Sequence, residues 1–115
     1  MRVLVTGSSG RLGAVTVQHL RTHGHDVTGI DLIPAETTDA LIDILNKDAV
    51  LAVTQNIDAI IHTAAIHGKH YELNYPREAF IDVNIYGTLN LLNACVTNGI
   101  SKLLYTSTTS IYGDV

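Results

Sequence analysis

The sequence predicts an α/β protein built on a doubly wound parallel sheet, with strand order 3-2-1-4-5 and helices on both faces. Two observations support this prediction. Short apolar runs rich in β-branched residues alternate along the chain with segments of helical periodicity, which is typical of βαβ units around a buried parallel sheet. The first apolar run also leads through a glycine-rich turn, Thr6 to Gly13, directly into the first helical segment.

The composition is that of a single folded domain. Hydrophobic residues make up 46% of the 115 residues, charged residues make up 16%, and the net charge is −4. The acidic balance without a basic run argues against nucleic acid as a partner, and no apolar run is long enough to span a membrane. The start of the chain does not resemble a signal peptide, and the single cysteine, Cys95, fits a reducing compartment, so we expect a cytoplasmic protein. His19 and His23 are spaced as metal ligands on a helix, but no third ligand is near, so we expect no metal.

The elements follow one another in the order that a doubly wound sheet requires. The first strand is expected over 2–6, and the first helix runs from Leu12 to about His23, where Gly24 ends it. Three apolar residues fall on roughly one side of this helix, which we expect to be its buried face: Leu12, Val15 and Leu20. The remaining elements are expected as a second strand over 27–30, a loop over 33–38, a short third strand over 40–44, a short helix over 47–55, a fourth strand over 59–65, a polar loop over 67–71, a long helix over 76–98 and a fifth strand over 103–105. The third strand is weakly marked, and the alternative is a helix that runs on to Val53.

The glycine-rich turn has the spacing G-x-x-G-x-x-G at a junction from strand to helix. Gly7 allows the tight turn off the strand, Gly10 lets the backbone approach phosphate oxygens, and Gly13 lets the helix pack closely on the sheet. The helix N-terminus adds free N–H groups and a partial positive charge. The turn therefore predicts a site for the pyrophosphate of a dinucleotide, and the alternative is a glycine-rich turn without a ligand.

Asp31 stands at the end of the second strand, 18 residues beyond Gly13, close to where dinucleotide-binding proteins place an acidic residue. A carboxylate at this position accepts hydrogen bonds from both hydroxyls of the adenosine ribose and repels a 2′-phosphate, so we expect NAD rather than NADP. Two alternatives stay open. Asp31 could only begin the loop that contains Pro34, and Arg11 near the turn could support the phosphate of NADP.

Further candidate residues lie at the carboxyl ends of the later strands. Asp43 and Ile44 end the third strand, where a polar group and an apolar face can receive adenine. Small side chains end the fourth strand and leave room for a ribose or a nicotinamide. His62 in that strand is expected to be a hydrogen-bonded core residue, while His67 in the next loop either touches cofactor or substrate or is solvated. Asn84 interrupts the apolar face of the long helix, so its amide either bonds the backbone or reaches the cofactor.

Six motifs occur in order along the chain: T-G-x-x-G-x-x-G at 6–13; Asp31; Asp43-Ile44; His62-Thr63-Ala64-Ala65; Asn84-x-x-Gly87-Thr88-x-Asn90-Leu91-Leu92; and Tyr105-Thr106-Ser107-Thr108 followed by Ile111-Tyr112-Gly113. Each motif alone is a weak signal, whereas all six in this order are specific. Together they resemble the N-terminal part of the extended short-chain dehydrogenase/reductase family, which includes NAD-dependent sugar epimerases and dehydratases.

The resemblance implies a Rossmann-type fold over residues 1–115 and a set of contacts with NAD. Arg11 and Leu12 would meet the pyrophosphate, and Asp31 would hold the adenosine ribose. Adenine would lie against Asp43 and Ile44. The resemblance also implies residues that line the channel for the nicotinamide half and its ribose: Thr63, Ala64, Ala65, His67, Asn84 and Thr106.

For catalysis, the resemblance implies a hydroxyl at Thr108 that hydrogen-bonds the reacting oxygen of the substrate, with Ser107 and Thr109 as the alternatives if the register differs. The family's catalytic base is a tyrosine followed four residues later by a lysine, and no Tyr-x-x-x-Lys pair occurs in this sequence. We therefore expect an incomplete, NAD-binding part of an epimerase, dehydratase or reductase for a nucleotide sugar or similar alcohol, which stops after the fifth strand and is inactive alone.

A rival interpretation is a non-catalytic dinucleotide-binding or sensing module of the same fold. In either case the fifth strand is expected to leave an open sheet edge, and apolar surface is expected to face water. Both features favour self-association, so we expect a homodimer formed through the long helix or the open edge.

Overall fold

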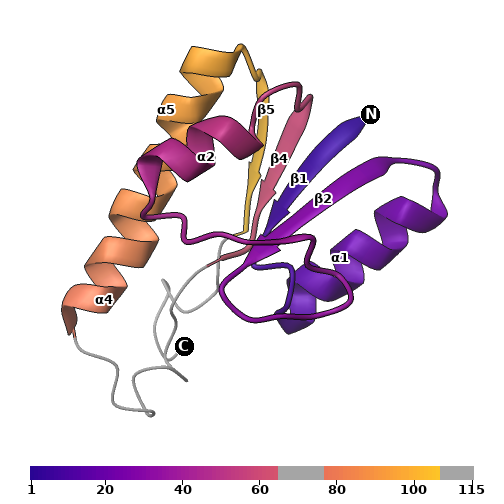
Figure 1. Ribbon diagram of the computed structural model, residues 1–115, viewed down its shortest axis with the longest axis horizontal. Helices are drawn as coiled ribbons and strands as arrows, with labels where there is room; N and C mark the ends of the chain where they lie inside the picture. Colours follow the sequence, from indigo (N-terminus) through magenta and orange to yellow (C-terminus); the bar gives the residue numbers. More distant parts are fainter. Residues whose placement is uncertain (65–76, 107–115) are drawn as a thin grey trace, which may run out of the picture.

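The computed structural model describes residues 1–64 and 77–106, and the strands in this part form one parallel sheet (Figure 1). The strand order is β3-β2-β1-β4-β5, which confirms the doubly wound arrangement predicted from the sequence. The strands are β1 (Arg2–Thr6), β2 (Asp26–Asp31), β3 (Ala40–Leu41), β4 (Ala59–His62) and β5 (Lys102–Tyr105). The helices are α1 (Arg11–Thr22), α2 (Lys47–Val53), α4 (Arg77–Ile81), the π-helical segment η1 (Asp82–Gly87) and α5 (Thr88–Asn98).

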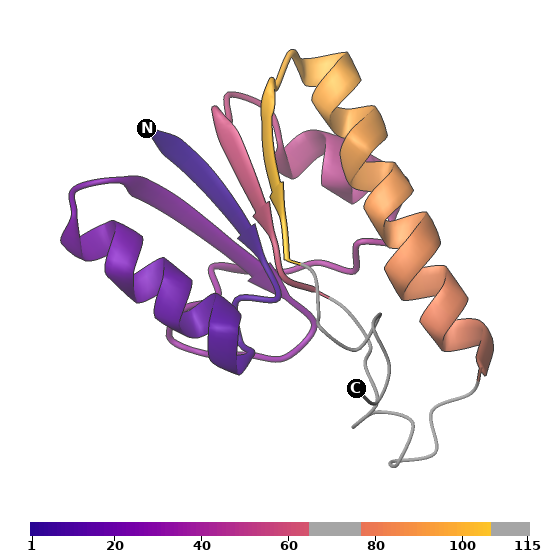
Figure 2. The same cartoon turned by 180° about the vertical axis from the view of Figure 1, so that it is seen from behind.

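Helices cover both faces of the sheet. The helix α1 lies on one face, whereas α2 and the long helix formed by α4, η1 and α5 lie on the other (Figures 1 and 2). Successive side chains of a strand point to opposite faces, so β1 contributes to two separate cores. Leu4 packs with Leu91 of α5 in one core, and Val3 and Val5 pack with Val17 of α1 in the other.

The buried side of α1 differs from the one that its apolar pattern predicts. Leu20 packs against the core as expected, but the side chains of Leu12 and Val15 are 54% and 60% exposed. The helix instead buries Gly13 and Val17. A Cβ atom at Gly13 would lie 2.0 Å from the carbonyl oxygen of the first glycine of the turn, so only this side of the helix can approach the sheet closely.

Several elements are shorter than the sequence predicts. The strand β3 covers two residues rather than 40–44, because Asp43 begins a turn in which its carboxylate accepts the N–H of Leu45 at 2.9 Å. The helix α2 and the strand β4 also end early, at Val53 and His62. The predicted order of elements is nevertheless retained throughout the described residues.

The long helix runs from Arg77 to Asn98 and has a π-helical segment, η1, within it, which the sequence pattern did not indicate. The helix ends at Asn98 as predicted, and Gly99 follows it in the left-handed conformation with φ 68°. At the end of η1, a Cβ atom on Gly87 would lie 2.4 Å from Cδ1 of Ile44, so the helix approaches the loop after β3 closely. Within the described ranges, neither this helix nor any other has the length and apolar character needed to cross a bilayer.

Candidate functional site

The carboxyl ends of the strands converge on the glycine-rich turn between β1 and α1 (Figure 1). Gly7 adopts φ 69°, and a Cβ atom there would lie 2.6 Å from Oγ1 of Thr63. The N–H of Gly10 donates to the carbonyl of Gly7 at 3.0 Å and closes the turn. No side chain caps the start of α1, and its first turn holds no acidic residue. The turn therefore has the backbone geometry and the free helix N-terminus that suit an anionic ligand.

One hydroxyl joins the glycine-rich turn to the end of β4. Oγ1 of Thr6 accepts hydrogen bonds from the N–H groups of Thr63 at 3.0 Å and Ala64 at 3.1 Å. The hydroxyl of Thr63 donates in return to the carbonyl of Thr6 at 2.6 Å. Because of these bonds, two of the predicted channel residues, Thr63 and Ala64, lie directly beside Gly7.

Asp31 ends β2 beside the glycine-rich turn, as predicted. Its Oδ2 atom accepts the N–H of Ser9 at 3.0 Å. Its Oδ1 atom accepts the N–H groups of Leu32 at 2.6 Å and Ile33 at 3.3 Å. The carboxylate is therefore oriented by backbone donors from two different segments of the chain.

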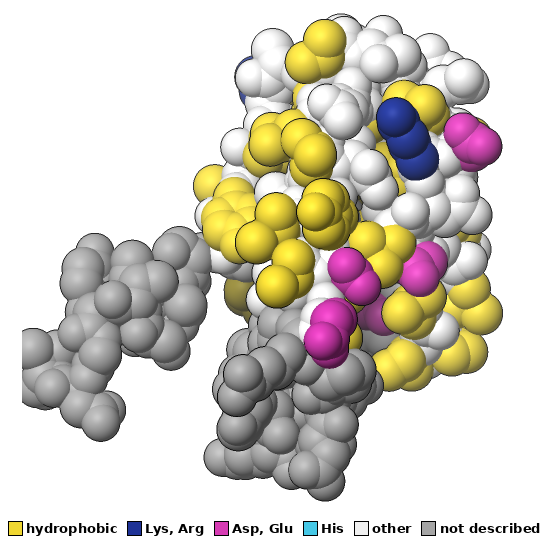
Figure 3. All heavy atoms as spheres, turned by 90° about the vertical axis from the view of Figure 1, so that its left-hand side faces the viewer, with side chains coloured by type: hydrophobic (Ala, Val, Ile, Leu, Met, Phe, Trp, Pro, Cys, Tyr) yellow, Lys and Arg dark blue, Asp and Glu magenta, His cyan; other side chains and the backbone are white. Residues whose placement is uncertain are grey.

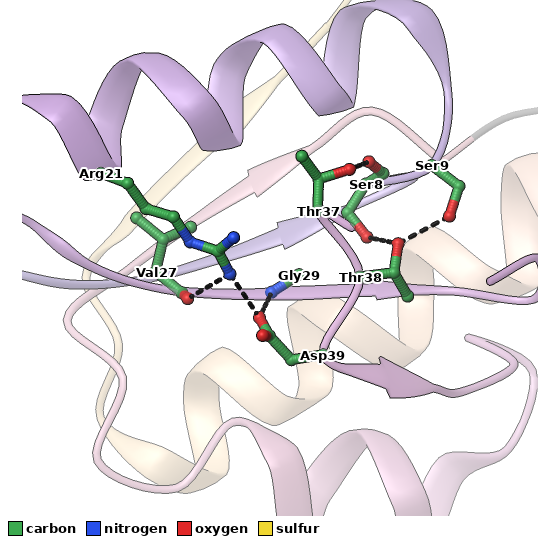
Figure 4. A network of polar contacts seen from close by, with 8 residues as sticks. All are labelled: Ser8, Ser9, Arg21, Val27, Gly29, Thr37, Thr38 and Asp39. Carbon is green, nitrogen blue, oxygen red and sulfur yellow. Dashed lines mark hydrogen bonds and ion pairs between the residues drawn. The ribbon is translucent and has the colours of Figure 1, made fainter. Parts of the chain in front are cut away.

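Hydroxyl groups connect the same turn to the loop before β3 (Figure 4). Oγ of Ser8 and Oγ of Ser9 each lie 2.6 Å from Oγ1 of Thr38. The hydroxyl of Thr37 donates to the carbonyl of Ser8 at 2.6 Å, and the hydroxyl of Ser9 donates to the carbonyl of Ile33. No motif in the sequence predicts a role for these side chains, although a Ser-Ser pair in the turn and a Thr-Thr pair in the loop stand out as hydroxyl donors and acceptors.

His62 is 1% exposed and lies within a continuous hydrogen-bonded chain, which confirms the expected core role. Because Oγ1 of Thr6 already accepts two backbone N–H groups, its hydrogen is directed to Nδ1 of His62 at 2.6 Å. Nε2 of His62 then carries the ring proton and donates to Oγ1 of Thr88 at 2.9 Å. The hydroxyl of Thr88 donates to the carbonyl of Asn84 at 2.9 Å. Burial lowers the pKa of His62 to about 4, so the ring is neutral at neutral pH.

Two residues predicted to approach the nicotinamide half are connected to this histidine. Asn84 is half-buried in η1, and its carbonyl is the end of the chain that begins at Thr6. Thr106 follows β5, and its N–H and hydroxyl donate to the carbonyl of His62 at 3.3 Å and 3.2 Å. The structure therefore brings both residues to the carboxyl edge of β4, while their contacts with a cofactor stay predictions.

The two residues predicted for adenine lie in the loop between β3 and α2. Asp43 is exposed, whereas Ile44 is 6% exposed and packs against Gly87 of the long helix. The carbonyl of Ile44 accepts the side-chain amide of Asn90 at 2.9 Å, which ties this loop to α5. The adenine contact stays a prediction for both residues.

Some of the remaining predicted site residues lie within the described part of the chain, and the others lie outside it. Arg11 and Leu12 begin α1 with exposed side chains beside the glycine-rich turn, and their contact with a pyrophosphate stays a prediction. Ala65, His67 and Thr108 lie outside the described residues. Among residues 1–64 and 77–106, no group of three or more histidine, cysteine, aspartate or glutamate side chains is placed to hold a metal ion.

Comparison with known proteins gives a consistent result. Residues 3–115 match the family model of the NAD dependent epimerase/dehydratase family. A 3-beta-hydroxysteroid dehydrogenase of Mycolicibacterium neoaurum is 37% identical over 120 residues, which cover 96% of this chain and 32% of that protein.

Two solved structures are similar in both sequence and fold. A short-chain dehydrogenase/reductase superfamily protein from Agrobacterium tumefaciens with bound NAD has a TM-score of 0.86 and 29% identity, covering 98% of this chain and 34% of that one. The UDP-glucose-4-epimerase of Stenotrophomonas maltophila with bound NAD and formylated UDP-arabinopyranose has a TM-score of 0.85 and 27% identity, covering 100% and 39%. The chain thus spans between 32% and 39% of the length of these three proteins. Because the family model matches nearly every residue, the chain belongs to the NAD-dependent epimerase/dehydratase family.

Proposed function

We propose that this chain is the NAD(H)-binding part of an oxidoreductase of the epimerase/dehydratase type that acts on a nucleotide sugar or a similar alcohol. The observation that carries the proposal is the position of Asp31, whose carboxylate is held beside the glycine-rich turn by the N–H of Ser9 at 3.0 Å. The epimerase of Stenotrophomonas maltophila, which shares this fold, contains both NAD and a nucleotide sugar.

The described residues fit the ADP half of NAD. The uncapped start of α1, free of acidic residues in its first turn, suits the pyrophosphate. Arg11 adds an exposed cation there, and Leu12 is proposed to border the same group. Asp31 is proposed to accept both hydroxyls of the adenosine ribose, with Asp43 and Ile44 on the adenine.

The nicotinamide half is proposed to lie along the carboxyl ends of β4 and β5. The proposed contacts are Thr63, Ala64, Ala65, His67, Asn84 and Thr106. Bound NAD supplies the group that accepts hydride from the substrate alcohol. Thr108 is proposed to hydrogen-bond the alcohol oxygen, whose proton would pass to the tyrosine base that the family resemblance implies.

A second candidate function is a non-catalytic dinucleotide-binding module of the same fold. One observation favours it: none of the tyrosines in the 115 residues is followed four positions later by a lysine, so the sequence holds no such acid–base pair. Under this candidate the chain binds NAD without transferring hydride. Formation of NADH when UDP-glucose is added to the purified chain and NAD would contradict it.

We also propose that the chain forms a homodimer in the cytoplasm. The long helix exposes an apolar strip, here called the outer stripe, and hydrophobic side chains gather on this face (Figure 3). Residues of the outer stripe recur every three or four positions and are 44% to 85% exposed: Ile81, Ile85, Leu89, Leu92 and Val96. An uncharged stripe with this spacing can pack against the same stripe of a second copy across a two-fold axis.

Isothermal titration calorimetry with the 115-residue chain tests the cofactor proposal. NAD and ADP-ribose should bind with similar affinity, and nicotinamide mononucleotide should bind more weakly, because the two charged side chains proposed to bind the cofactor, Arg11 and Asp31, both belong to the ADP half of the site. Binding of nicotinamide mononucleotide without ADP-ribose, or no binding of NAD at millimolar concentration, would overturn the proposal. The variant Asp31→Ala should weaken the binding of NAD. Asp26→Ala, at the opposite end of β2, is its matched control.

A further inference from the structure

The hydroxyl groups of Ser8, Thr38 and Ser9 form a hydrogen-bonded chain beside the glycine-rich turn (Figure 4). The contact of Ser9 with Ile33 sets the direction of donation along this chain. A hydroxyl donates only one hydrogen, and the hydrogen of Ser9 goes to the carbonyl of Ile33. The contact between Ser9 and Thr38 at 2.6 Å is therefore donated by Thr38. The hydrogen of Thr38 is then used, so the contact at 2.6 Å between Ser8 and Thr38 is donated by Ser8.

This chain ends in a closed ring around the carboxylate of Asp31. The N–H of Ser9 donates to Oδ2 at 3.0 Å, and the N–H of Ile33 donates to Oδ1 at 3.3 Å. The hydroxyl of Ser9 joins the two donors by bonding the carbonyl of Ile33. Thr38 donates into this ring at Ser9, so its hydroxyl fixes the residue that orients Oδ2.

The loop that carries Thr38 is anchored on both sides. Before it, Thr37 is 4% exposed and passes so close to β2 that a Cβ atom on Gly29 would lie 2.0 Å from the carbonyl oxygen of Thr37. After it, Asp39 accepts the N–H of Gly29 at 2.7 Å and pairs with Arg21 at 2.8 Å. These anchors hold the hydroxyl of Thr38 against the turn with little freedom to move away.

We propose that Thr38 is a positioning residue that sets the preference of the adenosine site for a free ribose 2′-hydroxyl over a 2′-phosphate. The proposal rests on the proposed binding of NAD. Thr38 acts on Asp31 through Ser9, whose N–H orients the carboxylate. A carboxylate held in one orientation can accept both ribose hydroxyls and repel a phosphate from a fixed distance. A carboxylate with one support removed does both less well.

The test measures dissociation constants for NAD and NADP on four forms of the 115-residue chain: the unchanged chain, Thr38→Val, Thr38→Ser and Ser8→Ala. Thr38→Val removes the donor to Ser9 at nearly constant volume. We expect the ratio of the dissociation constant for NADP to that for NAD to fall by about three- to tenfold, which is the effect of one neutral hydrogen bond. Thr38→Ser keeps the hydroxyl and should keep the ratio. Ser8→Ala removes the first donor of the chain but leaves the donation from Thr38 to Ser9, so its effect should be smaller.

A general loss of stability weakens the binding of both cofactors equally and leaves the ratio of their dissociation constants unchanged. The ratio therefore distinguishes a positioning role of Thr38 from a role in folding. If Thr38→Val does not fold, Thr38→Ala carries the same comparison. A ratio that stays constant in the valine or alanine variant, while NAD still binds, overturns this inference alone. Failure of the unchanged chain to bind NAD overturns the proposed function, and this inference with it.

Discussion

The N–H of Ser9 donates to the carboxylate of Asp31 at 3.0 Å and joins the glycine-rich turn to the end of β2. Parallel pairing of β1 with β2 makes this contact possible, because Thr6 and Ile30 lie opposite each other in the sheet. The residues that follow these two positions therefore meet at one edge. The sites proposed for the pyrophosphate and for the ribose are thus held in a fixed relation by the sheet itself.

Replacing Asp31 by alanine should weaken NAD binding by about ten- to a hundredfold, the effect of hydrogen bonds to a charged group. Binding of NADP should weaken less or improve, because the charge that repels the 2′-phosphate is removed. Titration of both cofactors measures the change. Asp26→Ala removes an exposed carboxylate from the same strand and should leave both affinities unchanged. Tighter binding of NADP than NAD to the unchanged chain would contradict the expectation.

Gly13→Ala should destabilise the protein by about 3 kcal/mol, although alanine is normally the better helix residue. The added Cβ atom would lie 2.0 Å from a backbone carbonyl, and the helix would have to move away from the turn. Gly24→Ala is the matched comparison, because its Cβ atom meets nothing within 4 Å and only the φ of 83° opposes it. That substitution should cost about 1 kcal/mol. Urea unfolding measures the free energy of unfolding of the two variants. Equal losses of this free energy would contradict the importance of the close approach at Gly13.

Stability should fall as pH decreases from 6.5 towards 4, with His62 as one cause. The pKa of His62 is lowered from 6.5 to about 4 by burial, so in this window the unfolded chain binds the proton and the folded chain does not. Above pH 6.5 this difference in proton binding costs no stability. Below pH 4 it lowers the free energy of unfolding by about 3 kcal/mol. His62→Gln keeps one acceptor and one donor but cannot titrate, so its stability should vary less with pH. Parallel pH profiles for the two proteins would contradict this assignment.

Leu89→Asp should convert a dimer of the chain into a monomer, because it places a charge at the centre of the outer stripe. Light scattering coupled to size-exclusion chromatography at several concentrations measures the mass. Val15→Asp is the control, since Val15 is 60% exposed on α1, on the opposite face of the sheet. A monomeric mass for the unchanged chain at every concentration would refute the proposed dimer.

Local patterns in the sequence were sufficient to predict the order of the elements along the chain, and the doubly wound fold that this order resembles supplied the strand order of the sheet. Continuous apolar runs mark buried strands, and the glycines at positions 7 and 99 mark turns that need a positive φ. Asp31 was also correctly placed at the end of its strand, because its position depends only on where a local apolar run stops. These properties are set by residues close together in the sequence.

The tertiary structure decided which groups meet. The apolar pattern of α1 predicted Leu12 and Val15 as its buried side, but the close approach of Gly13 to the turn selected another side. No sequence spacing could show that Thr38 donates to Ser9 or that His62 bonds both Thr6 and Thr88. Such partners are 26 to 56 residues apart, and only the packing of the sheet against its helices and loops brings their atoms within hydrogen-bond distance.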